Sequence, residues 1–383
     1  MKFTRFGCIL CQIQFNRIKM LKGDNINGYV VMQNFTTAGG GLSKWTFAQK
    51  SGKVYFLKEF LSPKYPTPDA PGSEKSKQRK LKECQKFEKH HQGLIQEVNE
   101  KCGIGGNLVF TVDFFRHKTK YYKVTEKIDV ASLSVAEIAS LPLANRILIL
   151  KTIAHSLNVL HNAQIVHGDL KPDNILIKRS KTGSYTAKLI DFDNSYFSEH
   201  PPEITEDVVG DMAFYSPELA LYIKEDPAVT PGDLTTKSDI FALGLLYALY
   251  LTGKMPEFDH EAYTYAGIAA IADKQIVLTA TDLPDKLNNL VTRMLQTNYH
   301  KRPGIGEVFN TLKTMDLGKE TFEADKTAKK TSGLSLKGNL LAKKETGGKE
   351  ATTPLPRKKP GATGEKTVGG LRGKGLSIRK KKD

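Results

Sequence analysis

The stretch that decides the fold is Val166-His167-Gly168-Asp169-Leu170-Lys171-Pro172-Asp173-Asn174, and Asp191-Phe192-Asp193 follows it. A lysine lies between an aspartate and an asparagine that are five positions apart, and the next aspartate comes 22 positions after the first. Between them, residues 174–177 and 187–190 flank a turn at residues 181–184, which predicts a small hairpin. We therefore expect carboxylate, amide and ammonium groups to converge on one place.

This combination of residue types suits the transfer of a phosphoryl group. That reaction needs a carboxylate to orient the attacking hydroxyl, oxygen ligands for Mg²⁺, and positive charge beside the moving phosphate. Each of these side chains taken alone would be an ordinary surface charge. The ordered set with these spacings instead indicates an active site.

The two motifs resemble the catalytic loop and the metal-binding loop of the protein kinases, and the resemblance covers roughly residues 29–317. It implies that Asp169 is the catalytic base and that Lys171 contacts the γ-phosphate of ATP, the co-substrate. It also implies that Asn174 and Asp191 hold Mg²⁺ or Mn²⁺. A lysine within Asp-Leu-Lys-Pro-x-Asn is similar to the Ser/Thr-specific branch of the family.

The same resemblance extends to the nucleotide-binding elements that precede the catalytic loop. Gly39-Gly40-Gly41 is similar to the loop that covers the phosphates, since glycines let backbone amides approach a phosphate. Lys58 matches the strand lysine that holds the α- and β-phosphates. Thr125 would be the gatekeeper of the adenine pocket, and the backbone groups of Glu126 and Ile128 would bind adenine.

The strand lysine needs a glutamate partner on the helix that follows it. Residues 74–101 form a long helical stretch, with one face made by Leu81, Cys84, Glu88, His91, Ile95 and Val98. Glu88 is the only carboxylate on this face, and an inward carboxylate costs free energy unless it is paired. We predict that Glu88 pairs with Lys58 in the nucleotide site, with Glu83 and Glu97 as alternatives.

Three downstream positions argue against the small-molecule kinases that share the fold. Ser216-Pro217-Glu218 resembles the Ala-Pro-Glu element, and Arg302 would be its buried ion-pair partner. Asp239 matches the helix aspartate that braces the catalytic loop from below.

Four positions depart from the family pattern. Lys44 stands where the third glycine of the phosphate loop is usual, and Asp193 stands where the metal-binding loop usually has glycine. Asp211 occupies the position of a threonine that is usual in Ser/Thr kinases. Gly168 precedes the catalytic aspartate where arginine is common, so one partner for a phosphorylated activation loop is missing.

The rest of the chain predicts a two-lobed α+β architecture of the protein-kinase type. Strand-like runs at residues 29–32, 54–57, 109–112 and 121–124, with the one long helix, make a small N-lobe. Helical periodicity dominates from residue 145 and makes a larger helical C-lobe. We predict an N-terminal extension at residues 1–28, the N-lobe at 29–128, the C-lobe at 129–317, and a basic disordered tail at 318–383.

Composition limits the class of protein. The 383 residues carry 57 Lys and Arg against 41 Asp and Glu, a net charge of +16. Four cysteines fit a reducing compartment, and the longest near-unbroken apolar run, residues 240–251, is too short to span a bilayer. We expect a cytoplasmic protein without a transmembrane segment, in which this run is a buried helix.

The excess positive charge gathers at the C-terminus. Residues 318–383 hold 18 Lys and Arg and 7 Asp and Glu, with no aromatic residue after Phe322. Such a segment cannot bury enough apolar surface to offset its ordering entropy, so we expect it to be disordered. Its charge predicts weak contact with polyanions.

The sequence therefore predicts an ATP- and Mg²⁺-dependent protein kinase, similar to the bacterial eukaryotic-like Ser/Thr kinases, that phosphorylates Ser/Thr hydroxyls of protein substrates. Two alternatives stay open. One is a pseudokinase-type scaffold that keeps the fold without the activity, although Lys58, Asp169, Asn174 and Asp191 are all present. The other is a nucleic-acid-associated protein that acts through the basic tail.

Overall fold

The computed structural model describes residues 20–37, 43–102, 106–128, 132–180, 183–274, 276–278 and 282–315. All of them lie in one compact unit, residues 1–329. The predicted glycine loop at residues 39–41, most of the N-terminal extension and the basic tail fall outside the described residues.

The N-terminal part is a six-stranded antiparallel sheet. Its strand order is β1 (Asn25–Ile26), β2 (Tyr29–Val31), β3 (Ser43–Lys50), β4 (Lys53–Phe60), β6 (Lys120–Glu126) and β5 (Thr111–His117). The sheet thus begins at Asn25, before the N-lobe boundary predicted at residue 29. The strand predicted at residues 109–112 lies at 111–117 instead, because the backbone at residues 107–109 bonds to Leu189 of the C-terminal part.

The two faces of this sheet carry different side chains. One face packs into a hydrophobic core that includes Ile26, Tyr29, Leu57, Tyr122 and Val124. Because side chains alternate along a strand, Lys58 and Phe56 of β4 and Lys123 and Thr125 of β6 lie on the opposite face.

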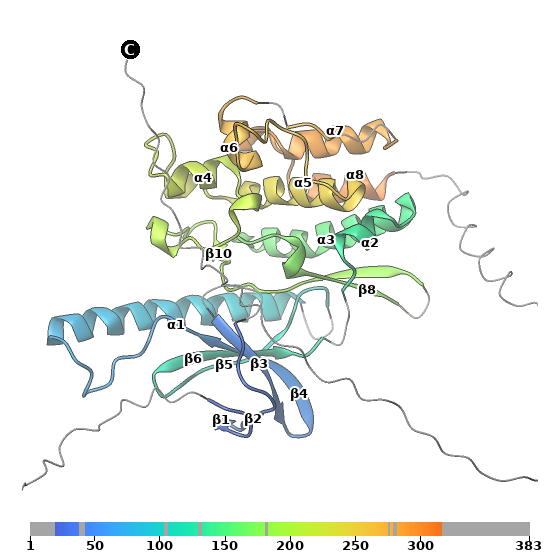
Figure 1. Ribbon diagram of the computed structural model, residues 1–383. Coiled ribbons are helices and arrows are strands. Elements are labelled where there is room, and N and C mark those ends of the chain that lie inside the picture. The colour runs from blue at the N-terminus through green and yellow to red at the C-terminus, as the bar shows by residue number, and fades with distance from the viewer. Residues whose placement is uncertain are drawn as a thin grey trace, which may run out of the picture. The chain divides into compact units, whose positions relative to one another are not determined.

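Helix α1 (Glu74–Cys102) lies between the sheet and the helical part of the molecule (Figure 1). The Oγ of Ser73 precedes the helix and accepts a hydrogen bond from the backbone N–H of Ser76 at 3.3 Å. Cys84, His91, Leu94 and Val98 are buried along one face of the helix. Cys84, His91 and Val98 belong to the predicted face, whereas the other three residues of that face are only partly buried.

The C-terminal part is mainly helical. Its helices are α2 (Val135–Ala139), α3 (Leu143–Asn162), α4 (Pro217–Ile223), α5 (Thr236–Thr252), α6 (Ala266–Ile271), α7 (Asp285–Met294) and α8 (Ile305–Lys313). Short strands make two ladders, β7 (Ile165–Val166) with β10 (Tyr196–Phe197), and β8 (Ile175–Arg179) with β9 (Tyr185–Leu189). The β8–β9 ladder is the hairpin that the sequence predicts.

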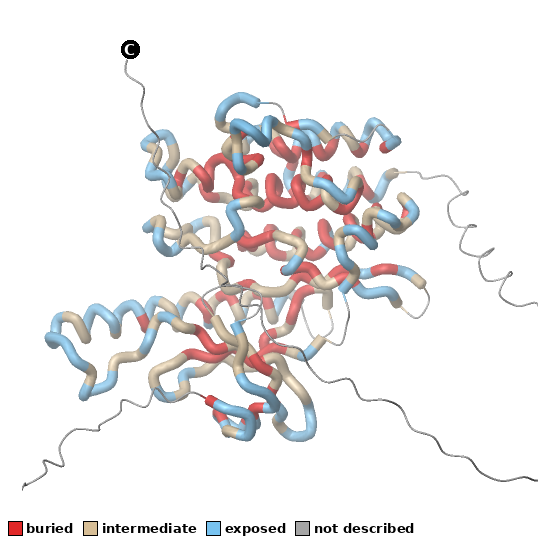
Figure 2. Tube along the Cα trace, viewed as in Figure 1, coloured by how far each residue is buried: buried red, intermediate tan, exposed pale blue. Residues whose placement is uncertain are grey.

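Helices α3 and α5 form the centre of the helical core, and Figure 2 shows most of α5 as buried. The apolar run at residues 240–251 lies within α5, which confirms the prediction of a buried helix. No helix among the described residues is long and apolar enough to cross a membrane. The buried α5 gives the loop after β7 a fixed base, on which the candidate site is built.

Candidate active site

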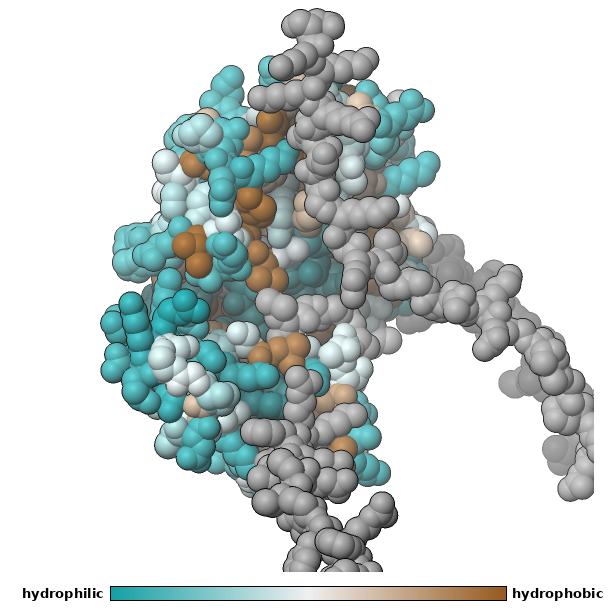
Figure 3. Space-filling view, turned by 60° about the vertical axis from the view of Figure 1, so that its left-hand side comes forward, coloured by the Kyte–Doolittle hydropathy of each residue, from teal (hydrophilic) through white to brown (hydrophobic). Residues whose placement is uncertain are grey.

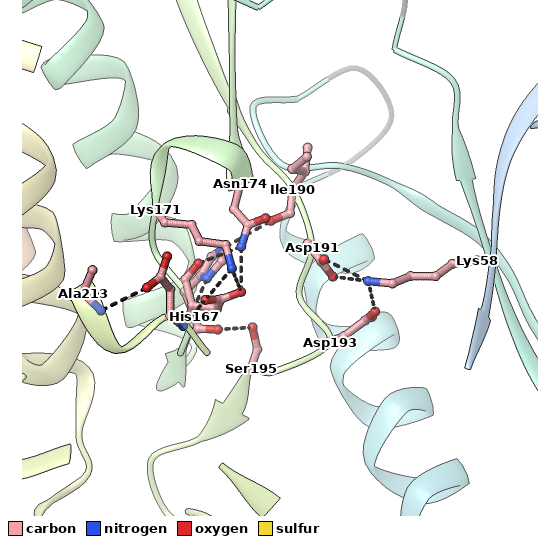
Figure 4. Close-up of polar contacts among 11 residues, drawn as sticks. Lys58, His167, Lys171, Asn174, Ile190, Asp191, Asp193, Ser195 and Ala213 are labelled. Carbon is pink, nitrogen blue, oxygen red and sulfur yellow. Dashed lines mark hydrogen bonds and ion pairs between the residues drawn. The ribbon is translucent and has the colours of Figure 1, made fainter. Parts of the chain in front are cut away.

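The loop between β7 and β8 brings three of the predicted site residues into direct contact. The Asp169 carboxylate accepts hydrogen bonds from Lys171 Nζ at 2.9 and 3.1 Å and from Asn174 Nδ2 at 3.0 Å. Asn174 Nδ2 also donates to the backbone carbonyl of Asp169 at 2.8 Å. Asn174 ends a short 3₁₀ turn, Pro172–Asn174, which folds it back over the aspartate. Figure 4 shows Lys171 and Asn174 directed into the same space.

Asp239 of α5 braces this loop from below, as the sequence predicts. Its carboxylate accepts hydrogen bonds from the backbone N–H groups of His167 at 2.7 Å and Gly168 at 3.1 Å. His161, in the last turn of α3, lies 2.9 Å from the same carboxylate. Asp239 is 2% exposed, so these buried contacts hold the catalytic loop on the core.

His167 is completely buried beneath the loop. Burial lowers the pKa of His167, against the opposing effect of Asp239. Its ring lies 5.4 Å from the ring of Phe192, and its backbone carbonyl accepts a hydrogen bond from the Ser195 hydroxyl at 2.9 Å. The catalytic loop and the Asp191-Phe192-Asp193 loop are therefore packed against each other.

Gly168 is required by the backbone at this point. Its φ is +79°, and a Cβ built on it would lie 2.5 Å from the carbonyl oxygen of Asn194. Any larger residue would meet both a left-handed conformation and a backbone clash. The departure from the family pattern at Gly168 thus has a local structural cause.

Asp191 and Lys58 meet across the two parts of the molecule. Lys58 Nζ donates to both carboxylate oxygens of Asp191 at 2.8 Å, and Figure 4 shows the lysine extended from its strand toward this loop. Asp191 has a φ of +61°, in the left-handed region that aspartate tolerates better than most residues. Its side chain is 34% exposed, which leaves it accessible to a ligand.

Asp193 is the second carboxylate on Lys58, and the sequence did not assign it a role. Its Oδ2 lies 2.6 Å from Lys58 Nζ, and its Oδ1 forms an ion pair with Lys123 Nζ. Burial by itself would raise the pKa of Asp193, but Lys123 and Lys58 lower it well below the usual range. The pKa of Lys58 is raised because Asp193 and Asp191 outweigh the effect of burial.

The structure describes both Lys58 and Glu88, and they do not form the predicted ion pair, so that prediction is wrong. The Glu88 carboxylate instead accepts a hydrogen bond from the Tyr121 hydroxyl at 2.7 Å. Burial, and then Glu88 itself, raises the pKa of Tyr121. The phenol of Tyr121 reaches Glu88 from β6, and the Lys58 ammonium is already bound by two aspartates.

Neither alternative glutamate takes that place. Glu83 lies 3.4 Å from Arg79 and Glu97 lies 3.5 Å from Lys101, both in pairs along α1. His91 of α1 is within range of the charges of Asp193 and Lys123. It is 4% exposed and packs against the rings of Phe60, Phe87 and Phe114. Burial lowers the pKa of His91 to about 3, so its ring is neutral at pH 7.

Two features of the sequence could have indicated the cluster of Lys58, Lys123 and Asp193. The first is Asp193, an acidic residue at a position where glycine is usual. The second is Lys123, which lies between Tyr121 and Thr125 on the inward face of a strand and has a side chain that is 6% exposed. A lysine in a buried strand needs an acidic partner, and Asp193 is an acidic residue to which the sequence had assigned no role.

The predicted hinge residues lie at the end of β6. Thr125 is buried and stands opposite Phe56, while Glu126 forms an ion pair with Lys188 of β9. Ile128 packs against the helical core. These positions place the predicted adenine contacts at the junction of the two parts.

Three aromatic side chains share the Lys58 face of the sheet. Trp45 and Phe56 stack with ring centroids 5.4 Å apart, and Phe47 lies edge-on to both, at 5.7 and 6.2 Å. Phe47 is directly opposite Phe56, which in turn is opposite Thr125. The cluster of Trp45, Phe47 and Phe56, which we call the aromatic face, therefore adjoins the hinge.

The segment after β10 positions Asp211 and Glu218. The backbone N–H of Asp211 donates to Asp169 at 3.3 Å, while its carboxylate accepts from the backbone N–H of Ala213 at 3.0 Å. Glu218, in the first turn of α4, forms a two-contact ion pair with Arg302 at 2.7 and 2.8 Å. Arg302 is 2% exposed, so the predicted buried pair is confirmed.

A groove of about 310 Å³ lies beside this segment. Val208, Val209, Met212, Tyr215 and Ile268 supply much of its apolar lining. Figure 3 shows hydrophobic residues gathered on this side of the helical part, bordered by hydrophilic ones. Gly210 is also part of the lining of the groove, and it is next to Asp211, which contacts Asp169.

The protein kinase domain family matches residues 74–312, more than half of the chain. The chain therefore belongs to the protein kinase family, and the predicted two-lobed α+β fold is confirmed. The matched range contains the catalytic loop and α5. It begins after β4, so the strand with Lys58 precedes it.

The chain is also similar to curated kinases over part of its length. It is 28% identical over 192 residues to a probable serine/threonine-protein kinase PknB of Lactococcus lactis, covering 49% of this chain and 28% of that protein. It is 27% identical over 165 residues to the calcium/calmodulin-dependent protein kinase cmkA of Emericella nidulans, covering 43% and 36%. An L-type lectin-domain containing receptor kinase of Arabidopsis thaliana is 32% identical over 178 residues, covering 43% and 24%. The chain thus spans about a quarter to a third of these relatives.

Proposed function

We propose that this chain is an ATP- and Mg²⁺-dependent protein kinase that transfers the γ-phosphate to Ser/Thr hydroxyls. One observation carries the proposal. Asp169, Lys171 and Asn174 are bonded to one another on the braced loop, and Asp191 and Lys58 face each other beside it. The relatives named as serine/threonine kinases support the same assignment.

The proposed roles follow from what each group can donate or accept. The Asp169 carboxylate orients the attacking hydroxyl and accepts its proton, while Lys171 places positive charge on the phosphoryl group as it moves. Lys58 holds the α- and β-phosphates. The oxygen of the acceptor hydroxyl bonds to the γ-phosphorus as the bond to the β-phosphate oxygen breaks, which releases ADP.

The donor set fits Mg²⁺ or Mn²⁺. The Asn174 amide nitrogen is used by Asp169, so its amide oxygen is directed to the other side, and the Asp191 carboxylate is partly exposed. Magnesium is usually bound by one or two such oxygen ligands together with substrate phosphates. A bound Mg²⁺ would neutralise charge on the phosphate oxygens, and Asn174 and Asp191 would hold it.

The aromatic face and the apolar groove suggest where the two substrates lie. The purine would stack against Phe56 and Phe47, beside the backbone groups of Glu126 and Ile128, with Gly39, Gly40 and Gly41 over the phosphates. A peptide would lie along residues 210–218, with an apolar side chain next to the phosphorylated residue in the groove. We therefore expect substrates with a hydrophobic residue adjacent to the acceptor.

The test is phosphoryl transfer from radiolabelled ATP by purified protein. Asp169→Asn should reduce transfer by about 10²–10⁴-fold while leaving nucleotide binding largely intact, because it removes the base and not a core residue. Asp191→Asn should remove both transfer and Mg²⁺-dependent nucleotide affinity. Full activity in either variant would contradict the assignment.

A pseudokinase-type scaffold is the second candidate, and the aromatic face is the observation that favours it. If Trp45, Phe47 and Phe56 occupy the place of the purine themselves, the protein would keep the fold and bind no nucleotide. Titration with a fluorescent ATP analogue separates the two candidates, since the kinase requires saturable, Mg²⁺-dependent binding.

Two further proposals concern the basic tail and the cellular location. We propose that residues 318–383 contact polyanions weakly, with an affinity that falls steeply as salt rises. We propose a cytoplasmic location from the low cysteine content. Removal of residues 318–383 should leave transfer to a short peptide unchanged.

A further inference from the structure

We propose that Asp193 is the positioning residue for Lys58, so that a loop carboxylate does the work expected of a glutamate on α1. The inference rests on the proposed kinase function and concerns how the phosphate-binding lysine is held. It starts from the ion pair of 2.6 Å between Asp193 Oδ2 and Lys58 Nζ.

The two aspartates on Lys58 differ in exposure. The side chain of Asp191 is 34% exposed, while those of Asp193 and Lys58 are 11% and 13% exposed. Asp191 is the proposed metal ligand and lies on the open side. Asp193 is therefore the carboxylate left for the lysine whenever Asp191 is used by the metal ion.

Lys123 fixes the position of Asp193. Lys58 on β4 stands directly opposite Lys123 on β6, and like charges that face each other across strands repel. Asp193 lies between the two, with Oδ2 on Lys58 and Oδ1 on Lys123. The cross-strand lysine pair thus needs a carboxylate at this position, and the carboxylate is held from two sides.

Helix α1 supplies no carboxylate to this cluster. Glu88 is bound to the Tyr121 hydroxyl, and the buried ring of His91, which lies within range of the charges of Asp193 and Lys123, is packed among three aromatic rings. A shift of α1 would therefore leave the ion pair between Lys58 and Asp193 in place. The position of Lys58 would then not be controlled by a partner protein that moves a glutamate on α1.

The experiment compares four proteins in a steady-state assay with MgATP and a peptide: wild type, Asp193→Asn, Glu88→Gln and Glu100→Gln. We expect Asp193→Asn to lower kcat/KM for ATP by tenfold or more, mainly through a higher KM. Glu88→Gln should cause the smaller loss, and Glu100→Gln, at an exposed site on the same helix, should match wild type. A larger loss in Glu88→Gln than in Asp193→Asn would overturn the proposal.

A double variant tests whether Asp193 positions Lys58 or only neutralises the charge of the buried Lys123. Asp193→Asn leaves Lys123 buried without its partner, and adding Lys123→Met removes that charge. We expect the double variant to recover the melting temperature but not the KM for ATP. Recovery of both would mean that Asp193 only neutralises Lys123.

A chemical measurement decides the question even if wild type transfers no phosphate, an outcome that would sink the proposed function alone. Lys58 is acetylated with acetyl N-hydroxysuccinimide in the absence of nucleotide, and the rate is measured by mass spectrometry. Asp193→Asn should raise this rate several-fold over wild type, and Glu88→Gln should not. Equal rates in wild type and Asp193→Asn would overturn the proposal.

Discussion

The two sides of the candidate site are held by different kinds of interaction. On the catalytic-loop side, buried hydrogen bonds from the backbone of His167 and Gly168 to Asp239 fix the loop on the helical core. On the lysine side, Lys58 is held by ion pairs to Asp191 and Asp193. The first side is built from groups that cannot change partners without breaking the core. The second is built from charged side chains, whose ion pairs can exchange partners without breaking the core.

The largest effect should come from the brace on the catalytic loop. Asp239→Ala leaves two buried backbone N–H groups and His161 without their acceptor, so we expect a loss of about 3–5 kcal/mol in the free energy of unfolding. Phosphoryl transfer should fall below detection. Urea denaturation and the kinase assay measure the two effects, with the exposed Glu261→Gln as control. If Asp239→Ala is as stable and as active as wild type, Asp239 does not hold the catalytic loop on the core.

Gly168 offers the next test of the same side. Gly168→Ala should cost about 2–4 kcal/mol, since it combines a left-handed conformation with a clash on the Asn194 carbonyl. Gly23→Ala is the matched control, because its φ is +93° but nothing lies within 4 Å of the added carbon. It should cost only about 1–2 kcal/mol. If chemical denaturation shows equal losses of unfolding free energy in the two variants, the clash with Asn194 does not contribute.

The lysine side should show a pH dependence through His91. Its pKa is lowered to about 3 in the folded protein, so the unfolded chain binds a proton below its own pKa of about 6.5 and the folded chain does not. This part of the stability is complete above pH 6.5 and is lost as pH falls. His91→Phe should therefore gain about 2 kcal/mol relative to wild type between pH 7.5 and pH 5. Urea denaturation at both values is the measurement, and a constant difference would contradict it.

The smallest effect concerns the aromatic face beside the lysine. Phe56→Ala removes one ring of the proposed stacking surface and should weaken binding of a fluorescent ATP analogue about tenfold, or ~1.4 kcal/mol. Phe115→Ala, which removes a ring from the opposite face of the sheet, is the control. Tighter binding in Phe56→Ala would favour the scaffold, in which the rings occupy the purine site.

Local patterns predicted the catalytic-loop side well. The spacing from Asp169 to Asn174 and the hairpin before Asp191 place these residues within one short segment, so their geometry depends little on the rest of the chain. The Asp239 brace and the Arg302–Glu218 pair were found because the resemblance supplied partners that spacing alone could not. The roles of these residues in catalysis stay predictions.

The lysine side was predicted less well. The sequence placed Lys58 on a strand and Glu88 on the inward face of α1, and both elements are present. The helix face is wide enough for several residues to point inward, however, and the pattern could not show that the Glu88 carboxylate would bind the Tyr121 hydroxyl and not Lys58. The glycine loop at residues 39–41 lies outside the described residues, so its role over the phosphates stays a prediction.

The sequence by itself determined the family, the two-part α+β architecture and the catalytic-loop geometry, because these depend on spacing within short segments and on periodic burial. Only the tertiary structure decided which carboxylate holds Lys58. That choice depends on the register that sets Lys123 opposite Lys58 and on the reach of Tyr121 to Glu88. Charges distant in sequence find partners through three-dimensional distance and burial, and neither quantity can be read from a local pattern.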